Sequence, residues 1–214
     1  LIKNENASSG ALCSAWYNKG LALSSMKLSE KAIEAYEKAY ELDESFISPL
    51  VNKANELGRL ELFDEFTKCA DIILRKDLGK IWTTDPHMSI SICRVLFNKA
   101  DILHYLAHKK QHELEEKIGK TKFDDLSVKD YPEIESLLIN ELDIYEKIWK
   151  MPPVALNYKK NKEMVIYRKA LVQQLLERFE DSNENLQMVL KINPEDIIAL
   201  MMKADNYRHM EKPE

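Results

Sequence analysis

The chain has 214 residues, 45% of them hydrophobic and 31% charged, which is too much apolar material for a disordered chain. A formal net charge of −5 argues against the basic face that a duplex-binding protein needs, so we expect no nucleic acid partner. The five glycines stand singly and the last is Gly119, a scarcity that disfavours sheets and α/β folds and favours helices.

The cysteines and the hydropathy pattern bear on where the protein works. Three cysteines with no CxxC spacing argue against a disulfide framework or a zinc site, and free thiols fit a reducing compartment. We therefore expect an intracellular protein of the cytoplasm or nucleus. No apolar run approaches the roughly 20 residues that a bilayer span needs, so no membrane partner is expected. The first residue is Leu1 rather than Met, which indicates a fragment of a longer protein.

One tetrapeptide theme recurs along the chain, with lysine at its third position. The lysine intervals at the two ends, Lys19 to Lys53 and Lys169 to Lys203, are both 34 residues. A period of 34 residues is that of a helix–turn–helix repeat. The five copies are Tyr17-Asn18-Lys19-Gly20, Val51-Asn52-Lys53-Ala54, Phe97-Asn98-Lys99-Ala100, Tyr167-Arg168-Lys169-Ala170 and Met201-Met202-Lys203-Ala204.

Segment 13–46 has the small and large residues that two closely packed helices need. Gly20 and Ala32 let the helices approach, and Trp16 and Tyr36 fill the space around them. The apolar positions of the second helix have helical spacing and are Ala32, Ile33, Tyr36, Ala39 and Tyr40. On these residues the segment resembles the tetratricopeptide repeat, a helix–turn–helix unit.

The rest of the chain is less regular. We expect Ser29 to cap the second helix of the first repeat. Residues 77–87, which contain Gly79 and Pro86, read as a loop. The next helix is expected to begin near Met88 and to be unusually long. A polar loop over 119–131 and a helix over about 132–150 follow, and one extra degenerate repeat in this region is the alternative. The predicted repeats are 13–46, 47–80, 88–153 with an insert, 163–196 and the half repeat 197–214.

The resemblance implies an all-α fold. We expect a right-handed α-solenoid of tetratricopeptide-type repeats with an irregular central insert, forming a single fragment over residues 1–214. The match is strongest over 13–46 and 163–207. A generic helical bundle is the alternative.

The resemblance also implies a groove lined by the first helix of each repeat. The groove is expected to be apolar and aromatic with a few polar anchors, a surface that suits an amphipathic helix or an extended apolar peptide. The alternative is that Tyr17, Phe97 and Tyr167 lie partly in the core, or that residues 119–131 fill the groove. The predicted partner-binding residues are Tyr17, Leu21, Val51, Asn55, Arg94, Phe97, Asp101, Tyr167, Leu171 and Met201.

The sequence gives no positive sign of catalysis. It has no GxGxxG, phosphate-binding loop, GxSxG or HExxH motif, so we expect no enzyme, no catalytic residue, no cofactor and no metal. His104, His108 and His112 follow one helix face four residues apart. A pair at this spacing can chelate a metal, but a partly exposed histidine stripe, or a pH-sensitive surface, is the favoured interpretation.

Three kinds of partner remain. The favoured one is a protein or peptide segment held by a scaffold or adaptor in a multi-subunit intracellular assembly. The second is the acidic C-terminal peptide of a chaperone, which the family's clamps bind through lysine, arginine and asparagine. Counted from the first repeat, Asn52 matches such a clamp and Arg94 is a tolerable swap for lysine, but Tyr17, Leu21 and Asn98 replace the residues it needs. Counted from the second repeat, Asn55, Asn98 and Arg168 match, but Val51 and Met164 replace both lysines. The third is a second copy of the chain, bound through an exposed apolar face on helix 197–210.

Overall fold

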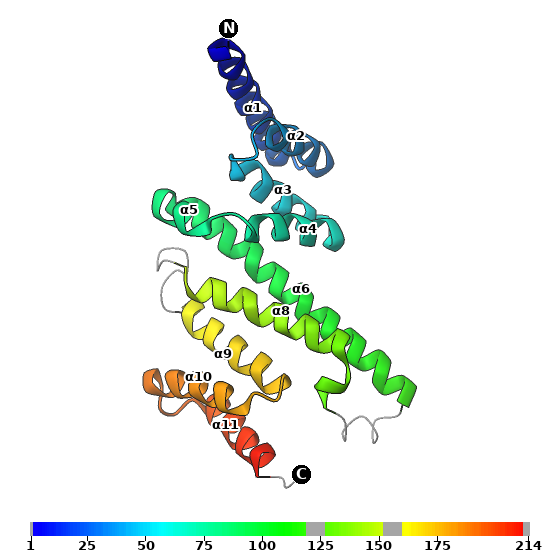
Figure 1. Ribbon diagram of the computed structural model, residues 1–214, viewed down its shortest axis with the longest axis vertical. Helices are drawn as coiled ribbons and strands as arrows, with labels where there is room; N and C mark the ends of the chain where they lie inside the picture. Colours follow the sequence, from blue (N-terminus) through cyan, green and yellow to red (C-terminus); the bar gives the residue numbers. More distant parts are fainter. Residues whose placement is uncertain (1, 119–126, 152–159, 212–214) are drawn as a thin grey trace. The chain divides into compact units, whose positions relative to one another are not determined.

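The computed structural model describes residues 2–118, 127–151 and 160–211, and every regular element in these ranges is helical (Figure 1). The all-α prediction is confirmed. The chain divides into two compact units, Leu1–Lys99 and Ala100–Glu214, here called the N-terminal and C-terminal units. The prediction of one continuous solenoid concerns both units together and stays a prediction. No helix within the described ranges is both long enough and apolar enough to span a bilayer.

The N-terminal unit is built from pairs of helices that pack in chain order. Helix α1 packs against α2, α2 against α3, and α3 against α4. The predicted repeats over 13–46 and 47–80 are thus helix pairs. The helices are α1 (Ile2–Ser25), α2 (Ser29–Leu42), α3 (Ile47–Arg59), α4 (Phe63–Leu74), α5 (Leu78–Thr84) and the first part of α6 (Pro86–Ile118).

Close packing of α1 on α2 depends on the predicted small residues. Ala32 and Ala39 have no exposed surface, and the Tyr36 side chain is 1% exposed. A Cβ atom placed on Gly20 would lie only 2.5 Å from two ring carbons of Tyr36. Because real Cβ atoms do not come this close, glycine is required where the ring crosses α1.

The C-terminal unit repeats the same plan. Helix α8 packs against α9, α9 against α10, and α10 against α11, around a core formed by Ile166, Ala170, Leu186, Val189 and Ala199. The buried Ser182 hydroxyl donates to the Ala170 carbonyl at 2.9 Å and accepts from Asn206 at 3.0 Å. The elements after α6 are η1 (Val128–Asp130), α8 (Pro132–Trp149), α9 (Lys160–Leu175), α10 (Phe179–Ile192) and α11 (Ile197–Met210).

The same left-handed turn joins the two helices of three repeats. Lys27, Glu61 and Glu177 have φ angles of 61°, 58° and 56°. The residue after each donates its amide to a carbonyl five positions back, which is the hydrogen bond of the Schellman motif. These bonds run from Leu28 to Leu23 at 3.0 Å, from Leu62 to Leu57 at 3.0 Å and from Arg178 to Gln173 at 2.8 Å.

The recurring lysine also has a structural role. In four of its five copies the ammonium group contacts an acidic or amide side chain on an earlier helix of the same unit. Lys53 pairs with Glu37 at 2.7 Å, Lys99 with Asp71, and Lys169 with Glu146 at 2.7 Å, while Lys203 donates to Gln187 at 2.8 Å. The lysine theme therefore marks where each first helix packs on an earlier one.

Two local predictions are wrong. Residues 78–84 form helix α5 rather than a loop, because the Asp77 side chain accepts a hydrogen bond from the Lys80 amide and caps it. Ser29 does not cap α2. Leu28 occupies that position, since its carbonyl accepts the first helical bond, and Ser29 is a buried first residue of the helix.

The central region follows the prediction in outline. Helix α6 is 33 residues long and begins at Pro86, two residues before the predicted start. Helix α8 covers Pro132–Trp149, close to the predicted 132–150. Most of the predicted polar loop, residues 119–126, lies outside the described residues.

Candidate functional site

The N-terminal unit contains a solvent-open hollow of about 450 Å³. Helices α1, α2, α3 and α6 each supply part of its wall. The lining residues are Leu21, Ser24, Tyr36, Asn52, Asn55, Glu56, Gly58, Arg59, Arg94 and Asn98. We call it the α1–α3–α6 hollow. Three of the predicted partner-binding residues, Leu21, Asn55 and Arg94, line it.

One carboxylate in this hollow is held in place. Glu56 is 2% exposed, and its Oε1 atom accepts a hydrogen bond from the Ser24 hydroxyl at 2.5 Å. The same oxygen lies 3.0 Å from the Arg59 guanidinium. The other oxygen, Oε2, is buried and has no hydrogen-bond partner among the described residues, so the carboxylate is only partly satisfied. Beside it, burial raises the pKa of Tyr36, so this phenol stays protonated at neutral pH.

Three other polar side chains in the hollow have no partner among the described residues. Arg94 is exposed and has no counter-ion there, and the side-chain amides of Asn55 and Asn98 make no hydrogen bond with the described part of the chain. Asn52 donates to the Tyr17 hydroxyl at 3.3 Å. A guanidinium and two free amides offer donors and acceptors to a peptide backbone or a carboxylate.

The other predicted partner-binding residues of the N-terminal unit are buried or half-buried. The half-buried Tyr17 ring packs edge-on against Phe46, with centroids 4.9 Å apart, and lies 6.1 Å from Tyr36. Phe97 is half-buried. Val51 has no exposed surface, so its prediction as a groove residue is corrected. A β-branched apolar side chain at this position fills the core and cannot contact a partner.

The remaining predicted residues belong to the C-terminal unit. Asp101 forms an ion pair with Arg168 at 3.5 Å, and Tyr167 packs against the core of α9, α10 and α11. Leu171 is half-buried, whereas Met201 is 67% exposed. Their role in partner binding stays a prediction.

Sequence reasoning missed the polar network around Glu56. Glu56 and Arg59 are three residues apart, a spacing usual for exposed pairs on helices, and nothing local showed that the carboxylate is buried. Ser24 joins the network from α1, which only the packing of α1 and α3 reveals. Asn52 and Asn98 were weighed only as parts of a chaperone clamp.

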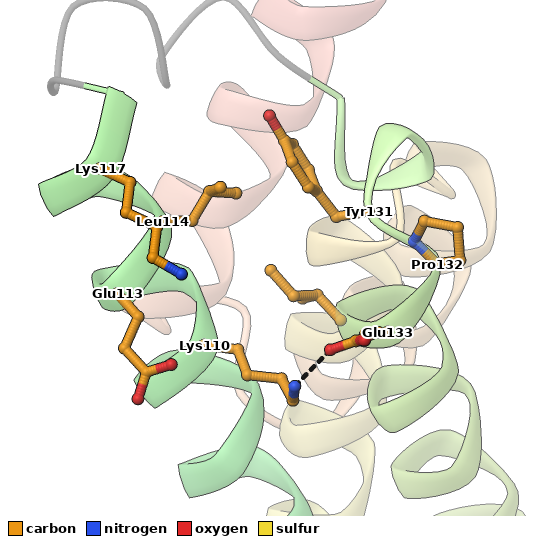
Figure 2. A pocket seen from close by; sticks show the side chains of 8 residues that line it. Lys110, Glu113, Leu114, Lys117, Tyr131, Pro132 and Glu133 are labelled. Carbon is orange, nitrogen blue, oxygen red and sulfur yellow. Dashed lines mark hydrogen bonds and ion pairs between the residues drawn. The ribbon is translucent and has the colours of Figure 1, made fainter.

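A smaller hollow of about 240 Å³ lies in the C-terminal unit between the end of α6 and the start of α8 (Figure 2). An ion pair between Lys110 and Glu133 joins its two sides. Lys110 and Glu133 thereby neutralise each other, and two further charged residues, Glu113 and Lys117, also line this hollow. Leu114 and Tyr131 also line it.

The predicted histidine stripe is divided between two environments. His104 contacts the buried Glu141 on α8 and also His108, whereas His112 lies 3.6 Å from Glu116 at the surface. Burial, and then the charge of His104, lower the pKa of His108. Within the described ranges, no three or more His, Cys, Asp or Glu side chains are arranged to hold a metal ion.

Sequence comparison identifies the first helix pair. Residues 13–46 match the family model of the tetratricopeptide repeat. This segment is similar to a tetratricopeptide repeat, as its sequence predicts. The matched segment lies within α1 and α2 and the turn after α2, and it supplies Leu21, Ser24 and Tyr36 to the hollow. No curated protein matches the chain in sequence.

Two solved structures of proteins with the same repeat are similar to the chain. One is YrrB, a TPR protein with an unusual peptide-binding site, at 20% identity over 88% of this chain and 90% of that one, with a TM-score of 0.35. The other is the TPR2AB domain of yeast Sti1 in its complex with pHSP90, at 16% identity over 94% and 85%, with a TM-score of 0.33. Neither likeness is close enough to transfer a binding site.

Proposed function

We propose that this chain is a non-catalytic scaffold or adaptor that binds an extended segment of a protein partner in the α1–α3–α6 hollow. The observation that carries the proposal is the set of unpartnered polar groups there, Arg94, Asn55 and Asn98, beside a tetratricopeptide repeat. Polar groups without protein partners are available to a ligand without breaking existing bonds.

The hollow favours a polar, extended ligand over an apolar helix. Leu21, 41% exposed, supplies apolar surface, Tyr36, 1% exposed, contributes little, and the other lining residues are mostly polar. Two arginines, Arg59 and Arg94, and one carboxylate, Glu56, line the hollow, so its excess charge is positive. Side-chain amides suit the peptide bonds of an extended segment, and Arg94 suits a carboxylate on it.

A second candidate is a module for acidic C-terminal peptides. Arg94 favours it, because an exposed guanidinium without a counter-ion can bind a carboxylate through two hydrogen bonds. The core residue Val51 stands where the clamp would need a lysine. We therefore rank this candidate below a general extended segment.

Affinity capture from a native lysate tests the proposal. The baits are the parent chain, an Arg94→Ala/Asn98→Ala variant, and an Arg75→Ala control, which removes an exposed arginine outside the hollow. We expect the parent and the control to retain one partner that the double variant loses. Circular dichroism checks that all three baits are folded.

Synthetic peptides from the captured partner then separate the two candidates. Loss of binding when the terminal carboxylate is amidated would favour the C-terminal module, whereas unchanged binding would favour an internal segment. If the double variant retains every partner of the parent, the hollow is not the binding site.

A further inference from the structure

The contact between His104, His108 and Glu141 is the most unusual polar cluster in the C-terminal unit. The His104 Nδ1 atom lies 3.1 Å from the Glu141 Oε2 atom on α8. The His104 Nε2 atom lies 3.1 Å from the Nε2 atom of His108, one turn further along α6. The two rings meet edge to face with centroids 4.5 Å apart.

The hydrogen bonds indicate which imidazole nitrogens could bind a metal ion. A carboxylate accepts hydrogen bonds, so His104 donates to Glu141 from Nδ1. In the neutral ring the His104 Nε2 atom then carries a lone pair, and His108 donates its Nε2 proton to that lone pair. A metal ion bound to both Nε2 atoms would displace this proton and lie beside the line that joins the two nitrogens.

The buried Glu141 carboxylate favours a positive charge on the neighbouring His104 side. Glu141 has no exposed surface, and its one ion pair among the described residues is with His104. A buried carboxylate is costly unless a positive charge or strong hydrogen bonds compensate it. A proton or a metal ion on the imidazoles can supply that charge. A carboxylate that holds the far nitrogen of a ligating histidine is also the usual outer-sphere partner in metal sites.

We propose that His104 and His108 form a two-histidine site for a divalent transition-metal ion such as Zn²⁺, with Glu141 as its positioning residue. Two Zn–N bonds of roughly 2.0–2.1 Å at a tetrahedral angle separate the nitrogens by about 3.3 Å, close to the observed separation. No third protein ligand lies within the described part of the chain, so water completes the coordination. His108 is exposed, which gives the ion a route from solvent.

Calorimetric titration of the tag-free chain with ZnCl₂ at pH 7.5 tests this site. We expect one ion per chain and an affinity about tenfold or more weaker in His108→Gln, since a lost ligand weakens binding at least as much as a lost outer-sphere partner. His112→Gln is the matched control, because His112 lies one turn further along the same helix and is exposed. Its affinity should equal that of the parent.

The role of Glu141 has its own test. Glu141→Gln keeps an oxygen that can accept from His104 but removes the charge, so zinc affinity should fall about tenfold to a hundredfold. Nitrogen couplings in the electron paramagnetic resonance spectrum of the Cu²⁺-loaded parent should show two imidazoles, and His108→Gln should show one. The site is rejected if the parent binds no zinc, or if His108→Gln binds as tightly as His112→Gln.

Discussion

At the scale of single residues, the repeat pattern in the sequence marks packing more reliably than binding. Ala32, Tyr36 and Ala39 are buried as their spacing predicts, and the recurring lysine joins neighbouring helices. Three of the ten predicted groove residues line the α1–α3–α6 hollow, and Val51 is buried. Core positions follow from periodicity, whereas a binding surface depends on which side chains the packing leaves without partners.

The contact between Gly20 and Tyr36 gives a stability prediction. Gly20→Ala should destabilise the N-terminal unit, because overpacking costs about 1–3 kcal/mol and exceeds the gain in helix propensity of about 1 kcal/mol. Gly10→Ala is the control, since an added Cβ at Gly10 meets no atom within 4 Å. It should stabilise the chain by up to about 1 kcal/mol. Urea unfolding measures both, and a stabilised Gly20→Ala would contradict the close approach.

At the scale of elements, the sequence located the helices well and their ends less well. The 34-residue period and the apolar spacing predicted the helix pairs α1–α2, α3–α4 and α9–α10. Helix α5 was missed because Gly79 and the two threonines have low helix propensity, while the Asp77 cap that favours the helix depends on local geometry. The left-handed turns were also missed, because lysine and glutamate do not mark that conformation as glycine does.

Those turns predict a stabilising substitution. Glu61 has a φ of 58°, a conformation that costs a non-glycine residue roughly 1–2 kcal/mol. Glu61→Gly should raise the free energy of unfolding by about 0.5–1 kcal/mol, after allowance for the flexibility of glycine in the unfolded chain. Glu65→Gly, an exposed position inside α4, should lower it by up to about 1 kcal/mol. If Glu61→Gly and Glu65→Gly changed the free energy of unfolding equally, the left-handed conformation of Glu61 would be contradicted.

The start of α11 gives a pH prediction. The Asp196 side chain accepts from the Ala199 amide at 3.0 Å, and the nearby Tyr167 hydroxyl together with that amide lowers the pKa of Asp196. A lowered pKa in the folded state means that the stabilisation is present above the ordinary aspartate pKa and is lost as pH falls through the folded value.

Asp196→Ala should therefore cost about 1 kcal/mol at pH 7, through loss of the helix cap, and less at pH 3. Asp196→Asn keeps a capping oxygen without the titrating proton, so its stability should change less with pH. Urea unfolding at the two pH values measures these differences. If the parent and Asp196→Ala differ in unfolding free energy by the same amount at both pH values, the charge of Asp196 does not contribute to stability.

At the scale of the whole molecule, two units with the same helical plan carry different polar sites. The N-terminal unit has the tetratricopeptide repeat and the α1–α3–α6 hollow, and the C-terminal unit has the histidine cluster. Helix α11 has exposed apolar residues, including Ile198 and Met201. Self-association through this helix stays a prediction. Sequence alone could not assign these sites, because each one joins side chains from helices far apart in the chain.

The most direct test of partner binding in the hollow is site-specific photo-crosslinking in a native lysate. An apolar photoreactive amino acid replaces Leu21, on the wall of the hollow, or Arg75, an exposed residue outside it. We predict one dominant crosslinked product from position 21, lost when Arg94→Ala is added, and none from position 75. The same product from position 75, or none from position 21 when the partner is captured, would contradict binding in the hollow.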